Sequence, residues 1–191
     1  MLRRRGRIAR VHGSDPVFIG ASATIGNPEE HATRVFGRKT QVVAENGAPT
    51  GERRIVVYNP PIVNAELGMR ASYLKSAVRL SADLVRAGVT TLVFGQSRNS
   101  VEVMLKYLRE RLAPEIGPEA IHAYRGGYLP QQRRAIEKSL RSGNIRCVVA
   151  TNALELGIDI GALDAVVCAG YPGSLAGTWQ RFGRAGRREG K

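Results

Sequence analysis

Arginine and glycine recur at three-residue spacing near the end of the chain, in the stretch Gln180-Arg181-Phe182-Gly183-Arg184-Ala185-Gly186-Arg187. Arginine presents a planar fork that fits phosphate groups, and glycine lets the backbone approach a ligand closely. A stretch that only extended a helix would avoid glycine, which costs about 1 kcal/mol at an interior position. The pattern therefore suits arginines that reach the phosphates of a bound nucleotide. The alternative is a basic helix end with its glycine cap.

The remaining parts of a nucleotide site are missing from the sequence. There is no G-x-x-x-x-G-K-[S/T] phosphate loop, because the single Gly-Lys pair is Gly190-Lys191. No Asp is followed directly by Glu, so there is no acidic pair to hold magnesium. Arginines suited to phosphate in a chain without a phosphate loop indicate that the chain supplies half of a nucleotide site shared by two domains. We therefore expect the chain alone to hydrolyse no nucleotide.

Composition points to a globular protein with a polyanionic partner. The formal net charge is +13, and 43% of the residues are hydrophobic, which suits a folded domain that contacts nucleic acid. Cys147 and Cys168 lie in apolar runs and at a spacing unsuited to zinc, so we predict buried free thiols and no metal site. No apolar run reaches the roughly 20 residues of a membrane span. We expect a cytoplasmic protein.

Strand and helix patterns alternate over most of the chain. Apolar or β-branched runs predict strands at 54–58, 90–94, 120–124, 145–150 and 165–169, and helical spacing predicts helices over 74–85, 101–112 and 130–142. This alternation predicts a doubly wound α/β domain with a mostly parallel sheet. Nearer the start, 1–13 carry a weak helical stripe rich in arginine, and 17–19 read as a short strand. The Gly/Pro-rich loop 46–51 suggests a domain boundary between about residues 37 and 53.

Ligands of such folds bind at loops beyond the carboxyl ends of the strands, and three loops there carry candidate residues. Ser97 and Arg98 begin a helix and could bind an anion, or Ser97 or Asn99 could simply cap that helix together with Glu102. In the next loop, Arg125 and Gly126 either approach a phosphodiester or form an ordinary strand-to-helix turn.

In the third loop, 150–161, a threonine directly follows an apolar run, and Gly-x-Asp comes near the end of the loop. Thr151 could contact a backbone phosphate, and Asp159 could accept a hydrogen bond from a ribose hydroxyl. A lone Asp in such a position is also a common helix cap.

The order of these segments resembles that of superfamily II helicases. Motifs III, IV, IVa, V and VI of that superfamily are similar to 22–24, 92–98, 124–130, 150–161 and 180–187, respectively. The sequence Ala-Leu-Glu-Leu-Gly-Ile-Asp-Ile-Gly at 153–161, followed by Tyr171-Pro172-Gly173, is similar to that of DNA helicases of the MrfA/YprA type. Leu156 stands where DEAD-box RNA helicases usually carry arginine, which weakens an RNA interpretation.

The resemblance implies a P-loop NTPase-type RecA-like fold without its own phosphate loop. Residues 1–45 would be the tail of a first RecA-like domain including motif III, and 46–191 a second RecA-like domain. ATP would bind between the domains, with Mg²⁺ held by the first. Single-stranded DNA would be the partner, with RNA as the alternative, together with the missing N-terminal RecA-like domain. A non-catalytic nucleic-acid-binding fragment is the third interpretation.

The resemblance also assigns roles to single residues. Arg184 and Arg187 would be catalytic arginines facing an open cleft, and ATP would be bound by Gly157, Asp159, Gln180, Arg184 and Arg187. The nucleic-acid backbone would be contacted by Ser97, Arg98, Arg125, Gly126 and Thr151. Ser22 and Thr24 would couple nucleotide state to strand binding, in an enzyme that acts in DNA repair.

Overall fold

The computed structural model describes residues 2–22, 25–45, 47, 52–154 and 163–186, apart from the side chain of Ala153. Four residues with predicted roles, Thr24, Gly157, Asp159 and Arg187, lie outside these ranges. The chain divides into two compact units, Met1–Ala48 and Pro49–Lys191. The assignment of 1–45 and 46–191 to two RecA-like domains stays a prediction.

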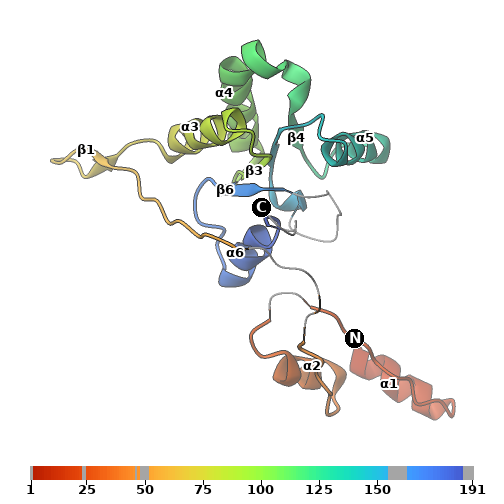
Figure 1. Ribbon diagram of the computed structural model, residues 1–191. Coiled ribbons are helices and arrows are strands. Elements are labelled where there is room, and N and C mark those ends of the chain that lie inside the picture. The colour runs from red at the N-terminus through yellow and green to blue at the C-terminus, as the bar shows by residue number, and fades with distance from the viewer. Residues whose placement is uncertain (1, 23–24, 46, 48–51, 155–162, 187–191) are drawn as a thin grey trace. The chain divides into compact units, whose positions relative to one another are not determined.

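A parallel sheet forms the centre of the second unit. Its strands are β3 (Thr91–Phe94), β4 (Ile121–Tyr124), β5 (Cys147–Ala150) and β6 (Ala165–Cys168), in the order β4-β5-β3-β6 (Figure 1). All three pairings are parallel. These strands coincide with four of the predicted apolar runs. Valine, isoleucine and leucine suit a sheet that is buried on both faces.

Helices cover both faces of this sheet. On one face lie α3 (Tyr73–Arg86) and α4 (Arg98–Ile116), and on the other lies α5 (Pro130–Arg141). The first face packs apolar side chains of α3 and α4 against alternate strand residues, among them Val78, Val101, Leu108, Val93 and Val149. The second packs Ile136 and Leu140 against Leu92, Val148 and Ala150. The doubly wound α/β prediction is therefore confirmed.

Shorter elements complete the second unit. They are a single helical turn η1 (Pro118–Ala120), a second turn η2 (Asn152–Leu154) and the helix α6 (Leu175–Phe182). A small antiparallel hairpin, β1 (Ile62–Asn64) with β2 (Met69–Arg70), forms a sheet of its own apart from the central one (Figure 1). No helix of the described residues is both long and apolar enough to cross a bilayer.

Two predicted strands are wrong. Residues 17–19 and 54–58 have no strand structure, and the valines at 56 and 57 are 84% and 92% exposed. β-Branched residues favour extended backbone, but a strand forms only where a neighbouring backbone supplies hydrogen bonds and burial. Neither run pairs with another strand among the residues that the structure describes.

The first unit contains α1 (Leu2–Val11), which confirms the predicted helix, and α2 (Pro28–Phe36). Phe18 stacks on Phe36 with ring centroids 5.4 Å apart, and the Arg38 guanidinium lies over Phe18. Arg38 also pairs with Asp15 at 2.8 Å, and its hydrogen bond lowers the pKa of that carboxyl. These contacts connect the segment that follows α1 to the end of α2.

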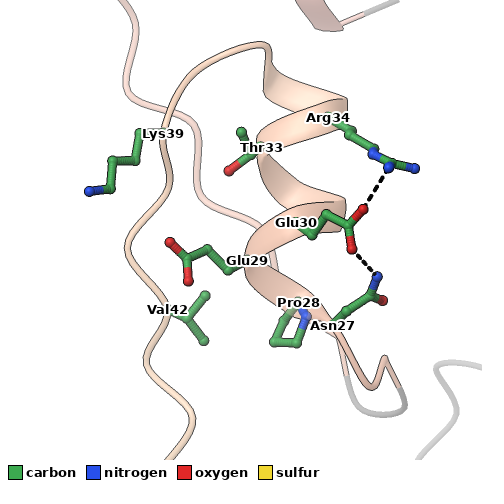
Figure 2. Close-up of a pocket in the computed structure, with 8 residues that line it drawn as sticks. All are labelled: Asn27, Pro28, Glu29, Glu30, Thr33, Arg34, Lys39 and Val42. Carbon is green, nitrogen blue, oxygen red and sulfur yellow. Dashed lines mark hydrogen bonds and ion pairs between the residues drawn. The ribbon is translucent and has the colours of Figure 1, made fainter.

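A surface pocket of about 760 Å³ lies beside α2 in the first unit (Figure 2). Glu30 pairs with Arg34 at 2.6 Å and accepts a hydrogen bond from the Asn27 amide at 2.8 Å. Glu29 and Lys39 also line this pocket. Because both charge signs are present and partly paired, the pocket does not concentrate the positive charge that phosphate requires.

Candidate nucleic-acid interface

The loops after β3, β4 and β5 emerge at the same edge of the sheet. The last residues of these strands, Phe94, Tyr124 and Ala150, are in register. The backbone continues this alignment, since the N–H of Gly95 donates to the carbonyl of Ala150 at 2.8 Å. The parallel sheet thus gathers the predicted nucleic-acid residues Ser97, Arg98, Arg125, Gly126 and Thr151 along one edge.

In the loop after β3, Ser97 is the N-cap of α4. Its Oγ accepts a hydrogen bond from the N–H of Ser100 at 3.1 Å, and its own N–H donates to Ser100 Oγ at 2.9 Å. Ser97 therefore caps the helix, with Ser100 in place of Glu102 as the second member, and its contact with an anion stays a prediction. Arg98 follows as the first residue of the helix and is exposed. The amino end of a helix attracts anions, so Arg98 lies where phosphate is favoured.

Gly95 lets α4 begin close to the sheet. A Cβ at this buried position would lie 2.8 Å from Met104 Cε and 2.9 Å from both Ser100 Oγ and Val101 Cγ2. Contacts that short force at least one of these side chains to shift, so the packing of α4 favours glycine here.

In the loop after β4, Arg125 is held from two sides. Its Nη1 lies 3.0 Å from Glu102 Oε1, and its guanidinium lies 5.1 Å from the ring centroid of Tyr128. Gly126 is exposed, and no atom of the described residues lies within 4 Å of a Cβ built there. The fold of this unit therefore does not itself require glycine at 126.

The end of β4 is joined to the middle of α5 through Tyr124, whose hydroxyl donates to Glu137 Oε1 at 2.8 Å. Burial, reinforced by Glu137, raises the pKa of Tyr124 to about 12. Arg125 therefore directly follows Tyr124, a residue held in place by burial and by this hydrogen bond. Thr151 directly follows β5 and is half-buried.

A fourth loop, after β6, joins the same edge. The amide group of Gln96 donates to the carbonyl of Tyr171 at 3.1 Å, and the N–H of Ala169 donates to the carbonyl of Phe94 at 2.9 Å. Sequence reasoning left Gln96 and Tyr128 without a role. The sequence offered one signal for each: Gln96 directly precedes Ser97, and Tyr128 lies in the same loop as Arg125.

The arginine stretch near the end of the chain follows α6. The guanidinium of Arg181 lies 4.9 Å from the centroid of the Phe94 ring, and this arginine is buried. Gly183 caps α6. The Gly183 cap matches the alternative of a helix end with its glycine cap, whereas the buried Arg181 is not the solvated charge of a basic helix end. Gln180, predicted to bind ATP, lies half-buried on α6.

Arg184 does not face an open cleft, because it is only 7% exposed. After α6 the chain forms a parallel bridge between Ala185 and Leu163, and the N–H of Gly186 donates to the Leu163 carbonyl at 3.1 Å. This attachment fixes the backbone that directly follows Arg184. Gly186 has φ of +70°, a conformation that itself favours glycine.

The predicted residues are thus distributed over three groups. Five lie along the edge of the sheet, and Gln180 and Arg184 lie on or just after α6. Ser22 is an exposed residue of the first unit. The coupling role of Thr24 and the nucleotide roles of Gly157, Asp159 and Arg187 concern residues outside the described ranges.

Comparison with known proteins gives a consistent result. A family model described as the helicase conserved C-terminal domain matches residues 72–189. The chain is 50% identical, over all of its length, to the uncharacterized ATP-dependent helicase YprA of Bacillus subtilis, of which it covers 26%.

Two solved structures extend the comparison. The DUF1998 helicase MrfA bound to DNA and AMPPNP matches with a TM-score of 0.89 and 50% identity, over 99% of this chain and 26% of MrfA. The Mycobacterium smegmatis helicase Lhr bound to ssDNA and AMP-PNP matches with a TM-score of 0.70 and 36% identity, over 89% of this chain and 22% of Lhr. The chain spans about a quarter of the length of these relatives.

Proposed function

Because the chain belongs to the helicase conserved C-terminal domain family of superfamily II, we propose that it is the second motor domain of an ATP-dependent DNA helicase. The observation that carries this proposal is the convergence of three loops, with Ser97, Arg98, Arg125, Gly126 and Thr151, at one edge of the sheet. Residues 1–45 would then belong to the first motor domain.

The edge suits the backbone of a nucleic acid more than its bases. Arg98 is exposed at the amino end of α4, and Gly126 leaves room for a close approach. Both contacts fit phosphate, which is the same in every nucleotide. We therefore expect binding that tolerates changes of base sequence.

Single-stranded DNA is the partner that we favour. Two relatives were solved with DNA, and in Lhr this DNA is single-stranded. RNA has the same phosphate chemistry and is the alternative. Ser22 and Thr24, as residues of motif III, would couple the nucleotide state to this grip. The cytoplasm is the compartment that we propose.

Gln180, half-buried on α6, fits a triphosphate by its chemistry, since its amide offers N–H donors to an anion, and Arg184 would contact the same anion only through the small part of it that is exposed. ATP would supply the phosphoryl group whose transfer drives movement, and Mg²⁺ would be held by carboxylates of the other motor domain. Arg187 is the residue that we assign chiefly to the γ-phosphate, with Gly157 and Asp159 beside the ribose. The burial of Arg184 gives it a share in holding this domain together.

Binding of the 191-residue chain to fluorescent oligo-dT and oligo-rU tests the strand proposal. Affinity should be weak, independent of base sequence and lower by a large factor between about 50 and about 200 mM salt, because bound phosphates release counterions. Arg98→Gln and Arg125→Gln should each reduce the salt slope by about 1.

The matched control is Lys106→Gln, which removes one positive charge from the exposed side of α4. It should leave the salt slope nearly unchanged. Affinity that does not depend on salt, or an equal loss in the control, would refute the assignment of this edge. Tighter binding of oligo-rU than of oligo-dT would favour the RNA alternative.

A further inference from the structure

A carboxylate stands among the residues that we assign to phosphate binding. Glu102 lies in the second turn of α4, and its Oε1 is 3.0 Å from Arg125 Nη1. The Glu102 side chain is 46% exposed and the Arg125 side chain is 35% exposed, so a nucleic-acid strand can reach both. The Arg125 guanidinium is also placed over the Tyr128 ring.

This ion pair changes what Arg125 offers to a strand. One N–H group faces Glu102 and one face of the guanidinium lies over Tyr128, so a phosphate meets the remaining N–H groups. A phosphate bound there would lie beside the Glu102 carboxylate. Both groups are negatively charged, so they would repel each other. The carboxylate therefore opposes the contact that Arg125 makes.

The fold does not depend on this pair. The amino end of α4 is capped by Ser97 and Ser100. The helix is fixed by fully buried Met104 and Leu108, and the Arg109 side chain donates to the carbonyl of Ile121 in β4 at 3.0 Å. Removing one partly exposed carboxylate leaves all of these contacts in place.

We propose that Glu102 competes with strand phosphate for Arg125, and thereby weakens and loosens the grip of the domain on single-stranded DNA. This inference rests on the proposed function. A motor that moves along a strand must release each phosphate that it binds, and a competing carboxylate beside the binding arginine promotes release. Glu102 is thus a positioning residue that sets affinity through Arg125.

The test measures binding of the 191-residue chain to oligo-dT by fluorescence anisotropy at about 100 mM salt, where charges more than about 10 Å apart are largely screened. Glu102→Gln keeps the shape of the side chain and removes its charge. It should tighten binding about two- to fivefold, the range that corresponds to one partly exposed ion pair. Glu110→Gln is the control, since it removes the same charge from the same helix, where Glu110 pairs with Lys106. It should change affinity by less than about 1.5-fold.

The mechanism is tested in an Arg125→Gln background. There Glu102→Gln should have no more effect than the control, because its partner is gone. Glu102→Ala, which retains good helix propensity, should reproduce the gain and guards against an effect peculiar to glutamine. Thermal melting of each variant confirms that it is folded.

Three results would overturn the inference. These are equal gains for Glu102→Gln and Glu110→Gln, an undiminished gain without Arg125, or weaker binding in both Glu102 variants. Failure of the proposed function looks different: the wild-type chain would not bind oligo-dT, or Arg125→Gln would bind as well as wild type. If Arg125→Gln weakens binding and Glu102→Gln changes nothing, the function stands and only the competition is refuted.

Discussion

Two glycines of the candidate edge should respond in opposite ways to the same change. Gly95→Ala adds a methyl group 2.8 Å from Met104 Cε and 2.9 Å from Val101 Cγ2 and Ser100 Oγ. The end of the methionine can move aside, but Val101 is fully buried and Ser100 completes the cap of α4. We expect a loss of about 1–3 kcal/mol in the free energy of unfolding, the usual effect of overpacking.

Gly126→Ala adds the same methyl group where no described atom lies within 4 Å and where φ is ordinary. Stability should be unchanged or higher by up to about 1 kcal/mol, because alanine restricts the unfolded chain. Affinity for single-stranded DNA should nevertheless fall, since the methyl group occupies the space where we place the phosphodiester.

The assay is thermal melting of both variants together with oligo-dT binding. For a chain of this size, each kcal/mol corresponds to roughly 2–4 °C in Tm. The reasoning is refuted if Gly95→Ala melts like the wild type, or if Gly126→Ala loses stability while keeping its affinity.

Further expectations concern stability and activity. Ser97→Ala should cost about 1 kcal/mol in urea unfolding, since it removes a helix cap, and an unchanged midpoint would contradict this. Arg184→Ala should lower the melting temperature by several degrees because this side chain is buried, whereas a wild-type Tm would restore the open-cleft interpretation. Raising the pKa of Tyr124 from 10.0 to about 12 contributes stability that is complete below pH 10.0 and lost as the pH rises towards 12. The stability difference between wild type and Tyr124→Phe should therefore shrink as the pH rises from 10.0 towards about 12 in urea titrations, and a constant difference would exclude this linkage. The purified chain alone should show no DNA-stimulated ATP hydrolysis, and measurable turnover would disprove that it lacks half of the site.

Much of the central fold could be predicted because its signals are local. The runs that became β3, β5 and β6 consist of apolar or β-branched residues throughout, which is the pattern of strands buried on both faces, whereas β4 is interrupted by His122. The helices between them keep apolar residues at helical spacing. In contrast, 17–19 and 54–58 have the composition of strands but no neighbouring strand among the described residues, and composition does not reveal a partner.

The helix α2 was missed although its signals are present. Pro28 stands at its first turn with Glu29 and Glu30, and Gly37 ends it with φ of +72°. These are the ordinary marks of a helix start and stop. The segment is short and buries no residue, so it lacks the apolar stripe on which the other helix predictions relied.

The sequence was enough to predict which loops form the candidate site, but not which side chains contact each other there. The parallel order of strands places Ser97, Arg125 and Thr151 at one edge, as the alternation indicated. The pairing of Arg125 with Glu102 depends on how α4 lies beside β4, which no local pattern specifies. The burial of Arg184, and the bridge between Ala185 and Leu163 beside it, are likewise tertiary features that no local pattern specifies.

Steady-state ATP hydrolysis with saturating single-stranded DNA, in a protein that carries both motor domains, tests the central claim most directly. Arg187→Ala should lower kcat by roughly 10²–10⁴ with an unchanged Tm, because an arginine finger acts mainly in the transition state. Arg187→Lys should recover little, since an ammonium group cannot make a forked contact, and Lys106→Gln should hydrolyse ATP at the wild-type rate. A near-normal kcat in Arg187→Ala would contradict the assignment of this chain as the arginine-supplying half of a helicase motor.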